Sequence, residues 1–340
     1  MSKTSFFFAA SLFAALLFGI SAPSKSPAPD SAQVPFSFIS MGDSQNAVIN
    51  FSVTLDQAAS LNPDFVLFNG DLEENGVLST EMDPMLTDML NAGLLDRTFL
   101  VRGNHDDHQA GSAALWEDYF TAANRPLPTG VTNYVAMDSS STYLTYSFDY
   151  GNSRFIGLDD PGSSDLITEA QYTFLDQRLT DAESVGLVHA FLYFHGPAYC
   201  VEAGHCDCRA RKDSSCTPTP FITLLNKHPI VSATFHGHEH ILGWVHMDGA
   251  RISNLTHSYE EFLTSPAGSE TYNDSLIPAR VDYAYMDMGN SQGFAAITVN
   301  GYSFTFSIYK NGTTTPVWSR TFTNISSASR NTCYLPLVLK

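Results

Sequence analysis

Residues 229–240 read PIVSATFHGHEH, an apolar run followed by three closely spaced histidines. The apolar run is typical of a buried strand. Histidine is scarce in this chain, with 11 among 340 residues. We therefore interpret His238 and His240 as candidate metal ligands and His236 as a neighbour. We expect His238 and His240 to lie on opposite sides of the turn that Gly237 permits, so they could serve two different ions.

Four other predicted strands also end in polar residues, usually beside a glycine. The segments are Gly42-Asp43-Ser44-Gln45, Gly70-Asp71, Gly103-Asn104-His105-Asp106 and His195. Each segment alone is compatible with an ordinary turn or a helix cap. Ligands of open α/β sheets, however, bind at the carboxyl ends of strands. The joint pattern therefore favours one shared site over five unrelated turns.

The donor types in these segments define a class of metal. Asp, Asn, Gln and His offer oxygen and nitrogen without thiolate, which suits Mn, Fe, Zn or Ni. The set is too large for one ion, so we expect two ions that share a bridging carboxylate. Two such ions can generate a hydroxide and hold both oxygens of an in-line displacement at phosphorus.

Strand and helix patterns alternate along most of the chain. We expect strands at 34–41, 64–70, 97–103, 153–159, 186–194 and 229–235, and helices at 47–61, 82–95, 168–183 and 221–227. Thr168 with Gln171 three residues later predicts a capping box. After Tyr283 short strands and turns follow, and Asn300-Gly301 predicts a hairpin. This order predicts an α/β domain with more than one sheet.

The charge of the chain argues against one class of partner. The formal net charge is -18, with 17 Lys and Arg against 35 Asp and Glu. Binding of a nucleic-acid duplex requires clusters of Lys and Arg, and the sequence contains none. We expect a small-molecule or other phosphoester substrate instead.

The N-terminus predicts export. Lys3 precedes an apolar stretch from Phe6 to Ile20 and then small residues and prolines, the layout of a signal peptide. A membrane-spanning helix needs about 20 apolar residues, so no span is expected after cleavage. We divide the chain into a signal peptide at 1–24, a linker at 25–33, one domain at 34–325 and a C-terminal tail at 326–340. The predicted location is secreted or in the cell envelope.

Four of the five cysteines lie close together, at Cys200, Cys206, Cys208 and Cys216. In an exported protein this cluster favours two disulfides. A structural zinc site that includes His205 is the alternative, but the spacing lacks paired Cys-x-x-Cys motifs. We expect the loop to lie beside His195, where it either shapes the substrate entrance or staples the surface.

The order of the polar segments resembles the calcineurin-like metallophosphoesterase superfamily over about Phe36 to Lys310, and GNHD (103–106) and GHEH (237–240) are its most specific motifs. The strand at 153–159, followed by a helix with Gln171-x-x-x-Leu175, is also similar to the family. The resemblance implies a four-layer α/β sandwich, in which two mixed β-sheets are flanked by α-helices.

The resemblance also implies a role for each polar residue. One metal ion would be held by Asp43, Gln45, Asp71 and His240, and a second by Asp71, Asn104, His195 and His238. Both ions would be Mn, Fe or Zn. His105 would contact the phosphoryl group or protonate the leaving oxygen, and Asp106 would orient His105. The implied activity is hydrolysis of phosphodiesters or phosphomonoesters, with nucleotides as one candidate class, by attack of a metal-bridging hydroxide on phosphorus.

The chain departs from the family pattern in two places. Gln45 stands where the family usually has His. We therefore expect weaker binding of the first metal and a preference for Mn or Fe over Zn. Glu74 replaces the more usual Asp at the end of the second motif. That motif has no Tyr, which argues against the purple-acid-phosphatase branch. Two other hypotheses are a non-catalytic cell-surface binding module that retains the fold, and a zinc-binding interaction protein built on the loop near Cys206.

Overall fold

The structure is a computed structural model. It describes residues 34–75, 78–107, 111–120, 126–137, 144–159, 167–201, 219–252, 254–272, 284–287 and 291–324. The predicted signal peptide, the linker up to residue 33 and the C-terminal tail lie outside these ranges. Most of the cysteine loop lies outside them as well.

The first sheet has six strands in the order β14-β13-β12-β1-β2-β3. Their bounds are β1 Phe36–Met41, β2 Phe65–Asn69, β3 Thr98–Val101, β12 Gly293–Asn300, β13 Ser303–Lys310 and β14 Trp318–Thr323. The strands β1, β2 and β3 are parallel, whereas β12 is antiparallel to β1. The carboxyl ends of β1, β2 and β3 therefore meet at one edge.

The second sheet has eight strands in the order β11-β9-β10-β8-β7-β6-β5-β4. Their bounds are β4 Val131–Ala136, β5 Tyr146–Tyr150, β6 Ser153–Gly157, β7 His189–Tyr193, β8 Val231–His236, β9 Leu242–Met247, β10 Tyr259–Thr264 and β11 Ala284–Asp287. The strands β6, β7, β8 and β10 are parallel, and the remaining pairs are antiparallel. Both sheets are thus mixed, as predicted.

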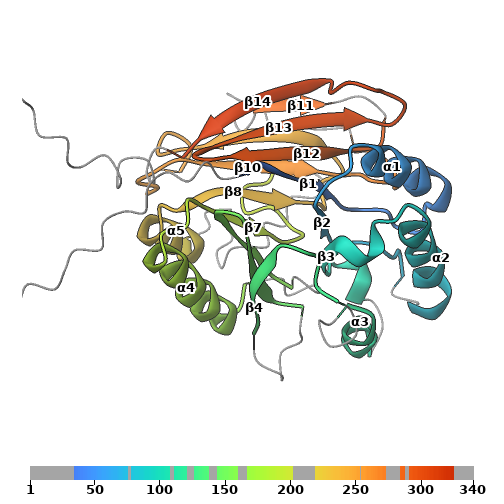
Figure 1. The fold of residues 1–340 in the computed structure, drawn as a ribbon, viewed down its shortest axis with the longest axis horizontal. Coiled ribbons are helices and arrows are strands. Elements are labelled where there is room, and N and C mark those ends of the chain that lie inside the picture. The colour runs from blue at the N-terminus through green and yellow to red at the C-terminus, as the bar shows by residue number, and fades with distance from the viewer. Residues whose placement is uncertain are drawn as a thin grey trace, which may run out of the picture. The chain divides into compact units, whose positions relative to one another are not determined.

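Helices cover the outer faces of both sheets, with α1 and α2 on one side and α4 and α5 on the other (Figure 1). The helices are α1 Val48–Ser60, α2 Leu78–Asn91, α3 Ser112–Phe120, α4 Glu169–Ser184 and α5 Thr219–Lys227, with 3-10 turns η1 Leu95–Arg97 and η2 His105–Asp107. A phenylalanine-rich core fills the space between the sheets. Two further cores lie under the helices. This arrangement confirms the predicted sandwich of two mixed sheets with flanking helices.

Several local predictions are confirmed at residue level. The Thr168 side chain accepts from the Gln171 N–H, and the Gln171 side chain accepts from the Thr168 N–H, which completes the capping box of α4. Gly301 has a φ of +60° in the turn between β12 and β13, where Asn300 pairs with Ser303. The strands β4, β5, β9 and β10 and the helix α3 were not predicted.

A buried ion pair joins the two sheets next to the GNHD motif. The Arg102 guanidinium, directly after β3, makes two hydrogen bonds of 2.9 and 2.7 Å to the Asp159 carboxylate after β6. Its third contact is with Asp107 at 2.8 Å. Removing one partner of a buried pair leaves the other charge uncompensated, which is costly. These contacts therefore hold the GNHD motif in place between the sheets.

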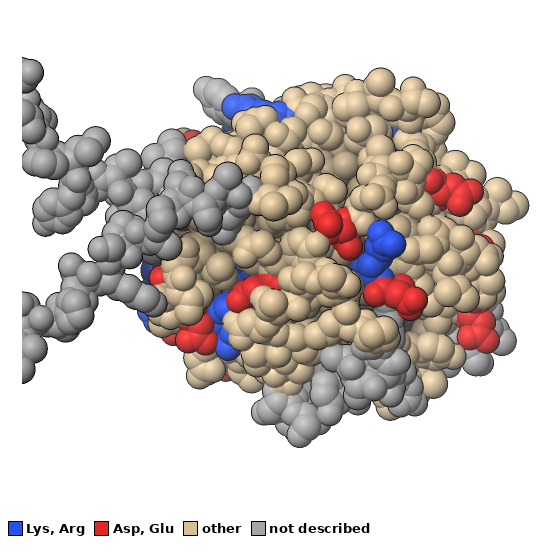
Figure 2. Space-filling model, viewed as in Figure 1, with Lys and Arg blue, Asp and Glu red and all other residues tan. Residues whose placement is uncertain are grey.

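Charged side chains are sparse on the face drawn in Figure 2, where several Lys and Arg lie close to acidic residues. The expectation that no nucleic-acid duplex binds stays a prediction. In the described part of the chain, no helix combines the length and apolar character needed to cross a bilayer.

Candidate metal centre

Unusual backbone conformations mark five of the predicted ligand positions. The φ angles are +59° at Asp43, +43° at Gln45, +55° at Asp71, +68° at His238 and +48° at His240. Non-glycine residues rarely adopt this left-handed region, and such strain gathers at functional sites. The strain is consistent with selection for the position of these side chains rather than for stability.

Glycines allow the polar side chains to approach the backbone closely. A Cβ atom at Gly103 would collide with the Asp71 carboxylate and the His195 ring. One at Gly237 would collide with the Asp43 carboxylate. These glycines are therefore required by the site rather than by the turn alone.

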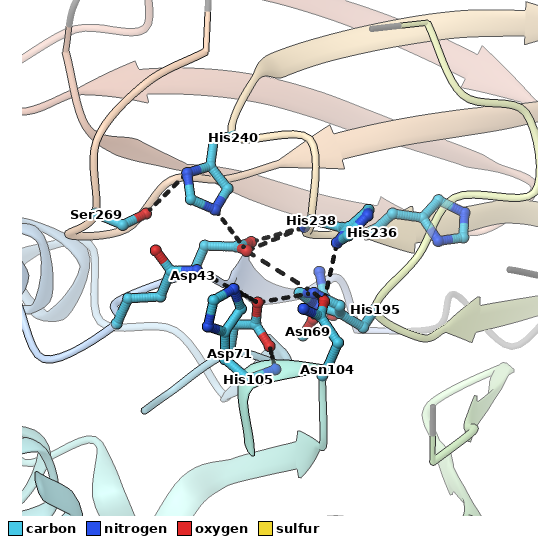
Figure 3. Close-up of polar contacts among 12 residues, drawn as sticks. Asp43, Asn69, Asp71, Asn104, His105, His195, His236, His238, His240 and Ser269 are labelled. Atoms are coloured by element: carbon cyan, nitrogen blue, oxygen red, sulfur yellow. Dashed lines mark hydrogen bonds and ion pairs between the residues drawn. The ribbon is translucent and has the colours of Figure 1, made fainter. Parts of the chain in front are cut away.

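One group of ligand atoms converges from β2, β3, β7 and β8 (Figure 3). His195 Nε2 lies 3.1 Å from Asp71 Oδ2 and 3.1 Å from Asn104 Oδ1. His238 Nδ1 lies 3.0 Å from the same Asn104 oxygen. Atoms of Asp71, His195 and His238 all lie within 4.8 Å of one another and could hold one ion. This group matches the set predicted for the second metal.

The second group adjoins the first. His240 Nε2 lies 3.1 Å from Asp43 Oδ1, and this oxygen is 4.0 Å from His195 Nε2. Asp43 also accepts hydrogen bonds from the His238 N–H at 3.1 and 2.9 Å. Asp43 and His240 are both almost fully buried. They match two members of the set predicted for the first metal.

Gln45 reaches the centre through one long contact with Asp71. Its Nε2 lies 3.4 Å from Asp71 Oδ2, so the amide nitrogen, which cannot bind a cation, faces the shared carboxylate. Rotation of the amide by half a turn would present its oxygen instead. The structure brings Gln45 to the centre, and its role as a ligand stays a prediction.

Backbone carbonyls select the tautomer of two of the imidazoles. The Nδ1–H of His195 donates to the Asn69 carbonyl at 2.7 Å, and the Nδ1–H of His240 donates to the Glu270 carbonyl at 2.6 Å. A carbonyl can only accept, so a proton resides on Nδ1 and Nε2 is the ring nitrogen that faces the centre. Carbonyl partners of this kind orient metal-binding histidines.

The histidines also govern the charge of Asp71. Burial alone would raise the pKa of this carboxyl, but His195, followed by His105 and His238, outweighs burial and holds the pKa below its usual range. Asp71 is therefore ionised at neutral pH. An ionised carboxylate with imidazoles around it is suited to a cation.

The role predicted for Asp106 is wrong. Its carboxylate accepts the backbone N–H groups of Asp71, Glu73 and Gly103 at 2.8 to 3.0 Å, rather than orienting His105. The His105 ring instead donates from Nδ1 to the Glu74 carbonyl at 2.8 Å. The physical reason is that η2 turns the Asp106 side chain back under the loop, where three amides need an acceptor. Asp106 positions the loop, and Glu74 orients His105.

His105 itself lies at the rim. Its N–H donates to Asp71 Oδ1 at 2.9 Å, and its Nε2 lies 4.0 Å from Asp71 Oδ2. About a quarter of its side chain is exposed, at 26%. It is therefore placed to meet a ligand that enters the centre from solvent.

His236 does not belong to the centre. Its Nδ1–H donates to the Phe194 carbonyl at 3.0 Å, and its Nε2 accepts from the Thr234 hydroxyl at 2.8 Å. Its ring lies apart from the ligand group in Figure 3. Burial is the main cause that lowers its pKa to about 3, so it is a neutral core histidine.

Sequence reasoning missed the segment after β10. The Ser269 hydroxyl and the Glu270 carbonyl both contact His240 Nδ1, at 3.2 and 2.6 Å, and the Tyr272 ring stacks on His240. The sequence TSPAGSETY (264–272) offers only ordinary turn residues, so no motif marks it. Asn69 was missed because it acts through its backbone.

The predicted cysteine loop is only partly described. Cys200 is buried, whereas Cys206, Cys208 and Cys216 lie outside the described residues. The predicted disulfides and the competing zinc site both stay predictions.

Comparison with known proteins agrees with this geometry. The sequence model of the calcineurin-like phosphoesterase family matches residues 36–242, more than half of the chain. None of the curated proteins matches the chain significantly.

Three solved structures are similar in fold. A purple acid phosphatase from yellow lupin (Lupinus luteus) seeds superposes with a TM-score of 0.66 and 15% identity over 93% of this chain. The chain covers only 59% of that enzyme. PhoD gives 0.62 and 12% over 87% of this chain and 70% of PhoD. A dimetal phosphatase from Danio rerio gives 0.60 and 14% over 85% of this chain and 99% of that protein.

At such low identity these likenesses show the fold alone, whereas the sequence match shows the family. The chain belongs to the calcineurin-like phosphoesterase family, whose members are hydrolases that act on phosphoric esters.

Proposed function

We propose that the protein is a phosphoesterase that works with two metal ions. The first ion would be held by Asp43, Gln45, Asp71 and His240. The second would be held by Asp71, Asn104, His195 and His238. Asp71 would bridge the two ions.

The position of Asp71 Oδ2, in contact with residues of both predicted ligand sets, is the observation that carries this proposal. His195 Nε2 lies 3.1 Å from it and Gln45 Nε2 3.4 Å, one from each predicted ligand set. The other Asp71 oxygen accepts the His105 N–H, so Oδ2 is the oxygen that both sets can share. Two buried carboxylates with three imidazoles fit Mn, Fe or Zn.

Two ions bound there would supply a nucleophile from water and positive charge for the phosphoryl oxygens. His105 would contact the phosphoryl group or give a proton to the leaving oxygen. The Glu74 carbonyl keeps the Nδ1 proton of His105 in place, so that Nε2 is the atom that faces the centre. Asp106 would hold Asp71 and Gly103 in register through their amides.

The test is hydrolysis of a generic diester, bis(p-nitrophenyl) phosphate, and of the matching monoester, by the full chain with Mn²⁺, Fe²⁺ or Zn²⁺. We expect turnover that EDTA abolishes and that metal restores. Full activity after exhaustive metal removal would refute the proposal. The ratio of the two rates would distinguish a diesterase from a monoesterase.

The non-catalytic binding module is the competing function. It would bind two ions without hydrolysing either ester. An enzyme would bind two ions and hydrolyse an ester. The zinc-binding interaction protein would instead release zinc on modification of the cysteines, with the centre at Asp71 intact.

We also propose that the protein is exported, on the basis of the N-terminal sequence. The mass of the mature protein, recovered from the medium or envelope fraction, tests this. A chain that keeps residues 1–24 and stays with the cytosolic fraction would contradict it.

A further inference from the structure

The segment that follows β10 forms part of the wall of the centre. The Ala267 N–H donates to the Gly42 carbonyl at 2.7 Å, and the Gly268 and Ser269 N–H groups donate to the Asp43 carbonyl at 3.2 and 3.1 Å. The segment is thus bonded to the backbone of a predicted ligand.

Side chains from other elements hold the same segment from outside. The Asn50 amide donates to the Gly268 carbonyl at 3.1 Å, and the Gln292 amide donates to the Ser269 carbonyl at 3.0 Å. A backbone held at this many points is a fixed support. Whatever it contacts in the centre is therefore held in one orientation.

Tyr272, at the end of this segment, lies face to face with His240. The two ring centroids are 4.2 Å apart and the ring planes differ by 16°. The Tyr272 N–H also donates to the His240 carbonyl at 3.5 Å. The ring and the backbone of Tyr272 therefore act on the same histidine.

Three contacts together determine the orientation of the His240 ring. The Glu270 carbonyl accepts a hydrogen bond from Nδ1–H, the Ser269 hydroxyl lies beside Nδ1, and the Tyr272 ring covers one face. A hydrogen bond at Nδ1 still allows the ring to tilt about that bond. The stacked ring opposes this tilt, because aromatic pairs have a preferred geometry.

The first metal depends on this orientation more than the second. Its predicted set contains a single imidazole, whereas the second set has two. Gln45 supplies at best a weak amide donor. A tilt of His240 would therefore remove a large share of the affinity for the first ion.

We propose that Tyr272 is a positioning residue, whose ring fixes the plane of His240 and thereby sets the affinity of the first metal site. The proposal rests on the dinuclear centre proposed above. It assigns the effect to the aromatic face, so the hydroxyl contributes little to metal binding.

The experiment is Mn²⁺ titration of the metal-free full chain by calorimetry, with metal counted after equilibrium dialysis. We expect two ions per wild-type chain. In Tyr272→Ala the weaker site should lose about tenfold in affinity while the tighter site is unchanged, the range seen when the support of a metal ligand is removed. Tyr272→Phe should bind both ions as the wild type does.

Tyr285→Ala is the matched control, because Tyr285 also stacks on an aromatic ring, Trp318, at 4.9 Å and 14°. It should leave both affinities unchanged. Circular dichroism confirms folding, and Tyr272→Leu replaces the alanine variant if that variant does not fold. Leucine fills space without a flat face, so we expect a similar loss.

Two results would overturn the inference. Wild-type affinity at both sites in Tyr272→Ala would show that the ring is not needed. An equal loss in Tyr272→Phe and Tyr272→Ala would assign the effect to the hydroxyl. If the wild type itself binds a single ion, the dinuclear centre and this inference fail together, whereas the first two results leave the dinuclear centre standing.

Discussion

The two halves of the candidate centre are built differently. The half at His195 and His238 brings two imidazole nitrogens to about 3 Å from the Asn104 amide oxygen, from the ends of three strands. The half at Asp43 and His240 has one imidazole and Gln45, which stands where the family usually has His. The segment after β10 supports this half. The number of imidazoles differs, so the second site should bind its ion more tightly than the first.

The weak point of the centre is the carboxylate that the two halves share. Asp71 belongs to both halves, so damage there removes both ions. Damage to one half should remove one ion and leave the other.

The largest effect is expected for Asp71→Asn. The loss of the shared carboxylate should remove both ions and lower kcat on the order of 10³-fold or more, because bound metal supplies several kcal/mol of transition-state stabilisation. Metal analysis and ester hydrolysis measure the two effects. The control Asp176→Asn changes a partly exposed carboxylate paired with Lys227 and should leave both unchanged. Two ions in Asp71→Asn would break the account of a shared ligand.

The next effect distinguishes the halves directly. His238→Ala should abolish the tighter binding event, and His240→Ala should abolish the weaker one. Each variant keeps the ligands of the other half. Titration with Mn²⁺ gives the stoichiometry and affinity of what remains. Identical residual affinities in the two variants would mean that the halves are equivalent.

A histidine outside the centre serves as a contrast with the ligands. His189 is buried in β7, where Nε2–H donates to the Gly301 carbonyl at 3.0 Å and Nδ1 accepts from Ser232. Burial lowers its pKa from 6.5 to about 4, although the bond to Gly301 opposes this. The unfolded chain therefore binds the proton more readily than the folded chain.

The direction in which stability changes with pH follows from this difference in proton binding. The contribution of His189 to stability is complete above pH 6.5 and is lost as the pH falls toward 4, by up to about 3 kcal/mol. Urea unfolding of the metal-free chain across this range measures it. His189→Gln should flatten the pH dependence. An unchanged slope in the variant would show that other groups dominate.

A smaller effect is expected for Gln45→His, which restores the family's usual donor. Imidazole is a better ligand than a carboxamide, so we expect the first site to bind metal about tenfold more tightly. Retention of metal during dialysis compares the variant with the wild type. Equal retention would count against Gln45 as a ligand and leave the weakness of the first half unexplained.

The strand ends could be predicted because the candidate ligands directly follow the apolar runs along the sequence. Apolar runs predicted β1, β2, β3, β7 and β8, and glycine with Asp, Asn or His after each run marked the ligands. Parallel strands bring their carboxyl ends to one edge, so residues as distant as Asp43 and His240 could be predicted to meet.

Other parts of the site depend on tertiary contacts that leave no local signal. The proposed role of Tyr272 could not be predicted from the sequence because it depends on a ring contact with His240. Asn69 acts through its carbonyl. Asp106 follows His105 directly, which suggested that one orients the other, but the 3-10 turn directs its carboxylate to three amides. The strand β4 was missed because partly and fully exposed residues interrupt its pattern.

The most direct test of the central claim is the return of activity as Mn²⁺ is added back to the metal-free full chain. The account predicts two equivalents per chain, with little hydrolysis until the weaker site, at Asp43 and His240, fills. It also predicts that neither equivalent binds tightly when Asp71 is replaced by Asn. Full activity at one equivalent, or with no metal at all, would contradict it.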